Sequence, residues 1–333
     1  MNVKYIVLWF VLPLLILGAV EAAIRKVGQQ RETWYPQVIR DKSYLGVQVI
    51  VLGSSRVGAA VNPSESKIRI LNLGRGYSTT AEHYLGLKRM VQSDPNALQG
   101  KLVLIEATGG LPEHIAYRGG AWFDPGNPSL MTKVISTSEL ADLWQCNAPS
   151  ELKWEVTLRL AANKLALFRY KELVQGLLVS NGSKVTEKLT WGKETSTNLS
   201  DAAGIRTDDV SQAAARKLAM GYLAQQRKDT RPLDNWSGTC IEKIIKLVKT
   251  SGGKVGFFET PLHSTFRAFY QEAPNRQNAD RFAKFAQLNA VPILRPKMTF
   301  ADSSFPDVWH LAQSDSKAYT AALEAEIDKV LPR

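Results

Sequence analysis

The sequence predicts an α/β protein built on a doubly wound parallel sheet. Five short apolar runs recur along the chain, and each ends close to a glycine or a polar residue. Their β-branched content, with little alternation, is typical of strands buried on both faces. Helical patterns fill gaps between them, and strands that alternate with helices form parallel sheets. With 333 residues and 44% hydrophobic content, the chain can bury such a core.

The chain opens with an uncharged apolar segment, Tyr5 to Val20. Its length lies between that of a signal-peptide core and that of a membrane-spanning helix. Val20-Glu21-Ala22 is a mediocre cleavage site because a glutamate precedes the small residue, so we expect an uncleaved anchor or signal-anchor over residues 1–26. Arg25 and Lys26 follow the segment, and by positive-inside counting they mildly oppose export of the rest of the chain.

A polar linker over residues 27–44 leads into the predicted domain, which spans residues 45–333. The runs that we assign to strands are Val47 to Leu52, Ile68 to Leu73, Leu102 to Ile105, Val255 to Phe258 and Val291 to Leu294. Residues 78–93 show helical spacing behind a Ser/Thr cap, and residues 240–253 form a helical pattern that ends in glycines.

Residues 111–235 interrupt this alternation and are too many for one crossover connection. They combine a glycine- and proline-rich loop, a long helical stretch and a polar tract rich in serine and threonine. We therefore expect a largely helical insertion or cap.

The net charge of +11 predicts attraction to polyanions of any chemistry, such as nucleic acid, anionic lipid or an acidic glycan. No motif selects nucleic acid, so we expect no nucleic-acid partner. A basic surface that only keeps the protein soluble is the default interpretation.

Cys146 and Cys240 are the two cysteines of the chain. Without a C-x-x-C pair or a histidine cluster, they predict no zinc site and no thiol redox motif, and we expect no metal and no cofactor. They form either one disulfide in an oxidising compartment or two separate buried thiols.

The turn after the first predicted strand, Gly53-Ser54-Ser55, carries the main functional signal. Ligands of open α/β sheets bind beyond the carboxyl ends of the strands, which is where these serines lie. A serine in a sharp strand-to-helix turn exposes its hydroxyl beside free backbone N–H groups, which supplies a nucleophile and part of an oxyanion hole. The alternative is a serine that caps a helix.

Asp307 and His310 lie three residues apart, just before the last amphipathic helix. This spacing lets the carboxylate reach the imidazole Nδ1 and fix its tautomer, so that Nε2 can accept a serine proton. Local roles in a loop and at a helix N-terminus are the alternative.

These residues resemble the sequence blocks of the SGNH or GDSL hydrolases, over roughly residues 45 to 110 and 250 to 330. Their first block, G-D-S, is similar to Gly53-Ser54-Ser55, which makes Ser55 the nucleophile. Their last block, D-x-x-H, matches Asp307 and His310. Their second block supplies oxyanion donors beside the Ser55 N–H, and it is similar to "NLGRG", with Gly76 preferred and Gly74 as the alternative. The resemblance implies a flavodoxin-like three-layer fold.

The third block of that family, G-x-N-D, has no match, because the chain reads "ATGGLPEH" after the strand "LVLIE". Loss of one oxyanion donor costs about 10²- to 10³-fold in turnover. This predicts either weak hydrolysis or a replacement donor, for which Thr108 and the insertion are the candidates. Glu106 ends the strand, and we expect it to be solvated, with a place in the pocket as the alternative.

The anchor, the G-S-S block and the large insertion are similar to a membrane-anchored, extracytoplasmic branch that acts in O-acylation of cell-surface polymers. That branch includes alginate O-acetylation proteins and the teichoic acid D-alanylation protein. The resemblance implies acyl transfer, and most simply O-acetyl transfer, to a polysaccharide, with an ester on Ser55, His310 as general base and Asp307 orienting it.

The same resemblance implies a bacterial inner-membrane protein whose catalytic domain lies in the periplasm. Its implied partner is a membrane-bound O-acyltransferase or a polysaccharide synthesis and secretion complex. The alternatives are a carbohydrate or lipid esterase with the same triad, and a non-catalytic scaffold of an acylation complex.

Further side chains are weaker candidates for substrate contact: Arg56, Arg75, Thr108, His263 and Trp309, together with Trp122 and Trp191. The arginines flank the glycine turns and could hold an anionic sugar or donor, and the tryptophans could stack on sugar rings. The ordinary alternatives are solvated arginines, a capping or surface histidine, and packed tryptophans.

Overall fold

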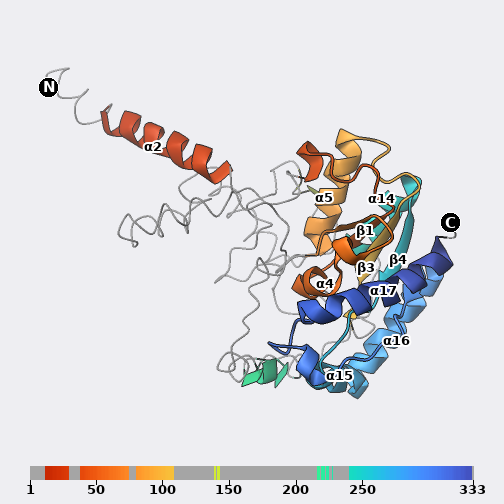
Figure 1. Cartoon of the computed structure of the whole chain (residues 1–333). Coiled ribbons are helices and arrows are strands. Elements are labelled where there is room, and N and C mark those ends of the chain that lie inside the picture. The colour runs from red at the N-terminus through yellow and green to blue at the C-terminus, as the bar shows by residue number, and fades with distance from the viewer. Residues whose placement is uncertain are drawn as a thin grey trace, which may run out of the picture.

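The computed structural model describes residues 12–29, 38–74, 80–108 and 240–331, with short pieces at 139, 141–142, 216–217, 219–221, 223–224 and 227. These residues form an α/β unit around a five-stranded sheet in which every pairing is parallel (Figure 1). The strand order is β2-β1-β3-β4-β5, which is the flavodoxin-like order of doubly wound folds. The prediction of a parallel α/β sheet is confirmed.

The five strands lie within one or two residues of the predicted runs. They are β1 (Val49–Leu52), β2 (Ile70–Asn72), β3 (Leu102–Glu106), β4 (Lys254–Phe258) and β5 (Ile293–Leu294). Strands β1 and β3 are buried along their whole length, as expected for the centre of a sheet covered on both faces.

Helices cover both faces of the sheet, and alternate strand residues point to each. On one face Ile50 and Leu52 pack with side chains of α5 (Thr80–Ser93), α14 (Cys240–Thr250) and α16 (Ala273–Leu288). On the other face Val49 and Val51 pack with the helices α4 (Ser55–Ala60) and α17 (Gln313–Val330). The two clusters give the domain three layers.

Helix α15 (Ser264–Gln271) contributes to a third, smaller cluster. In it Phe266 and Phe269 pack against Val308 and against Ala219 and Leu223, which belong to the predicted insertion. Two 3-10 turns, Pro63–Glu65 and Asp302–Ser304, complete the described elements of the domain. Apart from the short pieces named above, residues 111–235 lie outside the described residues.

Helix α2 (Leu12–Gln29) covers part of the expected anchor. None of the described helices combines the length and the apolar character that crossing a bilayer requires. Residues 1–11, which hold the start of the expected apolar segment, lie outside the described residues. The end of the expected linker packs on the domain, because Tyr44 and Val38 are buried in the core.

Cys240 opens α14 and is disulfide-bonded. Of the two states that the sequence left open for this cysteine, the structure contains the oxidised one. Cys146, the other cysteine of the chain, lies outside the described residues.

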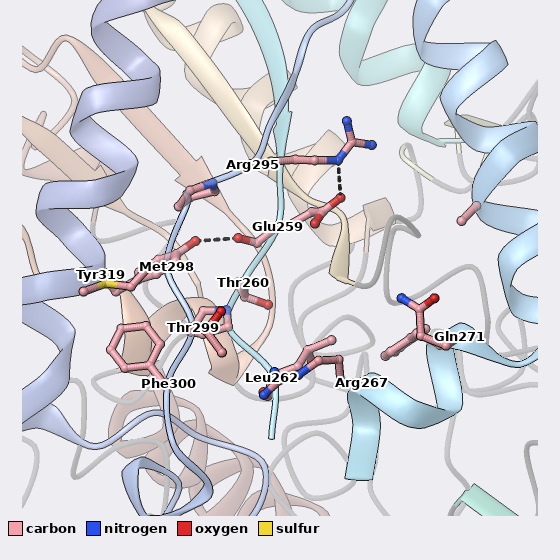
Figure 2. Close-up of a pocket in the computed structure, with 14 residues that line it drawn as sticks. Glu259, Thr260, Leu262, Arg267, Gln271, Arg295, Met298, Thr299, Phe300 and Tyr319 are labelled. Atoms are coloured by element: carbon pink, nitrogen blue, oxygen red, sulfur yellow. Dashed lines mark hydrogen bonds and ion pairs between the residues drawn. The ribbon is translucent and has the colours of Figure 1, made fainter. Parts of the chain in front are cut away.

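The carboxyl ends of all five strands meet at one edge of the sheet, where ligands of open α/β sheets bind. Ser55 lies at this edge, directly after β1. A cavity of about 400 Å³ lies at the same edge, beyond the ends of β4 and β5 (Figure 2).

Candidate active site

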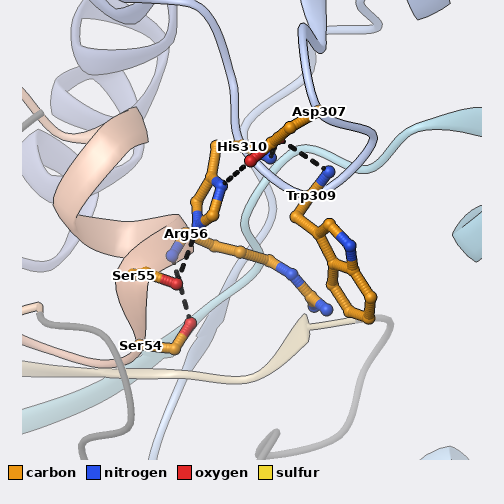
Figure 3. Close-up of polar contacts among 6 residues, drawn as sticks. All are labelled: Ser54, Ser55, Arg56, Asp307, Trp309 and His310. Carbon is orange, nitrogen blue, oxygen red and sulfur yellow. Dashed lines mark hydrogen bonds and ion pairs between the residues drawn. The ribbon is translucent and has the colours of Figure 1, made fainter. Parts of the chain in front are cut away.

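The turn between β1 and α4 gives its two serines different roles. Ser54 is the N-cap of α4, and its Oγ accepts a hydrogen bond from the Arg56 N–H at 3.2 Å. Ser55 is the first residue of the helix, and its side chain points to the histidine of the C-terminal loop (Figure 3). The capping alternative is therefore correct for Ser54, which leaves the Ser55 hydroxyl as the candidate nucleophile.

The structure brings Ser55, His310 and Asp307 into one hydrogen-bonded chain, although 255 residues separate the serine from the histidine. His310 Nε2 lies 2.8 Å from Ser55 Oγ, and His310 Nδ1 lies 2.5 Å from Asp307 Oδ2. An ionised carboxylate only accepts hydrogen bonds, so the Nδ1 proton points at Asp307 and the Nε2 lone pair faces the serine. In this arrangement Nε2 can take the hydroxyl proton.

The Asp307 carboxylate is held in the ionised form. Burial disfavours its charge, but hydrogen bonds from His310 and from two backbone N–H groups outweigh burial and lower the pKa of Asp307 below its ordinary value. The backbone donors are the N–H groups of Trp309, at 3.0 Å, and of His310, at 2.8 Å, and both reach Oδ1. The other oxygen is thereby reserved for the imidazole.

The loop that carries Asp307 and His310 contains a strained residue. Val308 has φ +70°, a left-handed conformation that is rare for a β-branched side chain. Its side chain is buried in the third cluster against Phe266 and Phe269. Strain of this kind costs about 1–3 kcal/mol and persists only where the surroundings hold it. The packing of Val308 therefore fixes the direction in which the loop presents its two polar side chains.

The buried carboxylate of Glu106 binds the turn between β1 and α4, which carries Ser54 and Ser55. Its Oε2 accepts the Ser54 N–H at 2.7 Å, and its Oε1 accepts the hydroxyls of Thr108, at 2.7 Å, and Thr260, at 3.1 Å. Glu106 is only 3% exposed, so our expectation of a solvated strand-end carboxylate is wrong. It is buried because donors from three strand ends converge on it.

His83, on α5, forms a second hydrogen bond to the same turn, at Gly53. Its Nε2 lies 3.2 Å from the Gly53 carbonyl oxygen, which can only accept, so Nε2 is the donor. The ring is buried. Sequence reasoning missed this contact, and no local pattern around His83 indicates it.

The candidate oxyanion donors are not equivalent. Ser55 is the first residue of α4, and its N–H therefore has no acceptor within the helix. The Gly74 N–H already donates to Asn72 Oδ1 at 2.8 Å, which weakens Gly74 as a donor. Gly76 lies outside the described residues, as does Arg75.

Thr108 does not fit the role of replacement donor. Its side chain is completely buried, and its single hydroxyl proton is donated to Glu106 Oε1, while Thr260 Oγ1 lies 2.8 Å from its oxygen. Thr108 is therefore not the replacement for the missing asparagine.

Arg56 and Trp309 support the loop of the triad. The Arg56 guanidinium carbon lies 5.0 Å from the ring centre of Phe266 and 5.5 Å from that of Trp309. Trp309 in turn packs on Phe266, with 4.4 Å between ring centroids. Arg56 is only 4% exposed, so the alternative of a solvated arginine is wrong, while contact with substrate stays a prediction. It joins α4 to the loop through cation–π contacts.

His263 is the N-cap of α15, as the capping alternative expects. Its Nδ1 accepts the Thr265 N–H at 3.1 Å, and burial lowers the pKa of the ring, which favours neutral imidazole. Trp122 and Trp191 lie outside the described residues.

Among the described residues no group of histidine, cysteine, aspartate or glutamate side chains is arranged to hold a metal ion. The chain matches no protein-family model and no curated protein sequence.

Proposed function

We propose that the protein is an SGNH-type serine acyltransferase that O-acylates an extracytoplasmic glycan through Ser55. The single observation that carries the proposal is the hydrogen-bonded chain Ser55–His310–Asp307 at the carboxyl edge of the sheet. Nucleophile, base and orienting carboxylate within hydrogen-bond reach of one another are the signature of covalent acyl transfer.

In the first half-reaction, Ser55 Oγ attacks the carbonyl carbon of an acyl donor while His310 Nε2 takes its proton. Asp307 stabilises the imidazolium, which then gives the proton to the leaving group as the bond to that group breaks. The product is an ester on Ser55. In the second half-reaction, a glycan hydroxyl attacks this ester, His310 takes the hydroxyl proton, and Ser55 Oγ leaves and recovers it.

The Ser55 N–H is positioned to donate to the oxygen on which negative charge develops, with the Gly76 N–H as the second donor that the resemblance implies. Because the asparagine donor of the family is missing, the protein is a better transferase than hydrolase in this proposal: a bound glycan hydroxyl supplies the proximity that a free water molecule lacks.

Two features support a location outside the cytoplasm, the disulfide bond of Cys240 and the motif resemblance. Stable disulfides are typical of oxidising compartments. The motif resemblance implies an extracytoplasmic domain, with a membrane-bound O-acyltransferase as the partner that supplies acyl groups. The proposal places the domain in the bacterial periplasm, on an inner-membrane anchor formed by the apolar N-terminus.

The first test is labelling of the 333-residue chain, purified in detergent, with a fluorophosphonate, followed by intact-mass analysis. We expect one adduct that is lost in Ser55→Ala and in His310→Ala. Ser54→Ala is the matched control: it removes the cap of α4 but keeps the nucleophile, so it should still be labelled. An adduct on Ser55→Ala, or no adduct on folded wild-type protein, would refute the proposal.

The second test separates transfer from hydrolysis. The chain is incubated with an aryl acetate and a short oligosaccharide, and acetylated sugar and free acetate are measured by mass spectrometry. Acetylated sugar as the main product supports the transferase. Acetate alone assigns the same triad to an esterase.

A further inference from the structure

A helical piece of the predicted insertion packs with the triad loop, the loop that carries Asp307 and His310. The described residues between 216 and 227 are helical, and we refer to them as the insertion helix. Ala219 and Leu223 are four residues apart, which places them on one face of this helix, and both are buried. That face packs in one cluster with side chains of α15 and of the triad loop (Figure 1).

Phe266, on α15, connects this cluster to both halves of the triad. Its ring centroid lies 4.4 Å from that of Trp309, in the triad loop. The guanidinium carbon of Arg56, the residue after Ser55, lies 5.0 Å from the centre of the same ring. Phe266 is only 1% exposed, and close-packed side chains transmit displacements to one another. A shift of this ring therefore reaches the nucleophile helix and the loop of the base together.

Val308, in the same cluster, is the residue that depends most on this packing. Its φ of +70° is unfavourable for a β-branched side chain, and such strain persists only where the surroundings hold it. Strain of this size corresponds to a ratio of about 5- to 150-fold between the populations of a relaxed and a strained loop. Because Val308 directly follows Asp307, relaxation of the loop would move the carboxylate away from His310 Nδ1.

The insertion helix makes two contacts with α15 that differ in weight. Arg227 forms an ion pair with Glu272, the C-cap of α15, with 2.5 Å between Nη2 and Oε1. The two side chains are 44% and 37% exposed, and exposed pairs contribute little to stability. Leu223 is only 1% exposed, and burial of a leucine side chain contributes much more. The leucine is therefore the contact that keeps the insertion helix on the cluster.

We propose that Leu223 is a positioning residue for the triad. By its packing in the cluster with Phe266 and Val308, it keeps the triad loop in the strained conformation in which His310 reaches Ser55. The reaction that it serves rests on the function proposed above, but the loop geometry that it maintains can be measured without any reaction. The predicted insertion thereby sets the reactivity of a nucleophile that belongs to the α/β sheet domain.

The test is a double-mutant cycle on the 333-residue chain in detergent, measured as the second-order rate constant of fluorophosphonate labelling. Leu223→Ala should lower this constant about tenfold, within the range that the strain sets. Glycine adopts a φ of +70° without strain, so in a Val308→Gly background Leu223→Ala should lower it by less than about twofold. Leu98→Ala is the matched control. Leu98 is a fully buried leucine of another cluster, so its loss should lower stability but leave labelling of the folded chain unchanged.

A second measurement does not require Ser55 to react. The chain has four histidines, so ¹⁵N labelling of histidine and NMR can report the tautomer of His310, assigned by its loss in His310→Ala. Leu223→Ala should change the single Nδ1–H tautomer into a mixture, because the imidazole loses its fixed partner Asp307. The double variant Leu223→Ala/Val308→Gly should restore the single tautomer.

Denaturant unfolding shows whether each variant is folded. Wild-type labelling and a wild-type tautomer in Leu223→Ala, an equal loss in Leu98→Ala, or an equal loss in the Val308→Gly background would overturn this inference. The two measurements also keep the proposals apart. Labelling of Ser55 that does not depend on Leu223 refutes only the positioning role, whereas the expected tautomer changes in a chain that is never labelled refute only the acyltransferase.

Discussion

Asp307→Asn should abolish the reactivity of Ser55 while keeping the shape of the loop. The orientation of the new amide follows from the contacts of the aspartate. Oδ1 accepts two backbone N–H groups, at 3.0 and 2.8 Å, and only a carbonyl oxygen can replace it there. The amide NH₂ must then face His310 Nδ1, where the carboxylate lay 2.5 Å away. An NH₂ group donates, so Nδ1 becomes the acceptor and the imidazole proton moves to Nε2.

A proton on Nε2 points at Ser55 Oγ and removes the lone pair that should accept the serine proton. In a serine triad a wrong tautomer of this kind lowers turnover by about 10⁴-fold, and we expect a loss of that order in the second-order rate constant for fluorophosphonate labelling. Asp302→Asn is the control. Asp302 accepts hydrogen bonds from the backbone N–H and the hydroxyl of Ser264, the first residue of α15, and does not contact Ser55, so the same substitution in this neighbouring turn should leave labelling unchanged. Labelling of Asp307→Asn at more than about a tenth of the wild-type rate would refute the tautomer argument.

The Asp307→Asn substitution should also change how the unfolding free energy depends on pH. The folded-state pKa of Asp307 is lowered, so its ionised form contributes stability that is present above the unfolded-state pKa and is lost as pH falls through the folded-state pKa. Asparagine does not titrate. The difference in unfolding free energy between wild type and Asp307→Asn should therefore shrink as pH falls below about 4, measured by denaturant unfolding at a series of pH values.

Two other predictions concern the groups that hold the site. Glu106→Gln should keep an acceptor for the Ser54 N–H but weaken the charged hydrogen bonds, and so lower the unfolding free energy by about 1–2 kcal/mol. Glu106→Ala should lower it by about 3 kcal/mol, because the buried donors lose their acceptor. Denaturant unfolding checks this, and equal stability of Glu106→Ala and wild type would contradict it. Val308→Gly should be about 1 kcal/mol more stable than Val308→Ala, since only glycine relieves the strain at φ +70°. A glycine variant less stable than the alanine variant would show that the residue is not strained.

The sequence was sufficient to predict the sheet and the hydrogen-bonded contact of Ser55, His310 and Asp307 for the same physical reason. A strand buried on both faces needs an unbroken apolar run, and such runs can be read locally. Asp307 and His310 lie close enough in sequence that their contact is a local property as well. Their meeting with Ser55 follows from the fold, because the carboxyl ends of parallel strands share one edge.

The supporting contacts could not be predicted in this way, because each depends on partners that are distant in sequence. Glu106 is buried by Ser54 and Thr260, which lie 52 and 154 residues away. Arg56 is covered by the rings of Phe266 and Trp309. A charged residue read alone is expected to be solvated, and only the assembled fold shows which ones are enclosed.

The structure also explains why the first motif reads Gly-Ser-Ser. A Cβ on Gly53 would lie 2.7 Å from Glu106 Oε2 and 2.3 Å from a methyl carbon of Val57, so the residue must be glycine for the buried carboxylate to reach the turn. Ser54 then caps α4 with its side chain and gives its N–H to that carboxylate. Because both oxygens of Glu106 already accept hydrogen bonds from these donors and from threonine hydroxyls, Glu106 is a poor base for the nucleophile. Among the described residues the proton of Ser55 has one acceptor, Nε2 of His310. The two buried carboxylates therefore have different roles: Glu106 holds the turn between β1 and α4, and Asp307 sets the tautomer of His310.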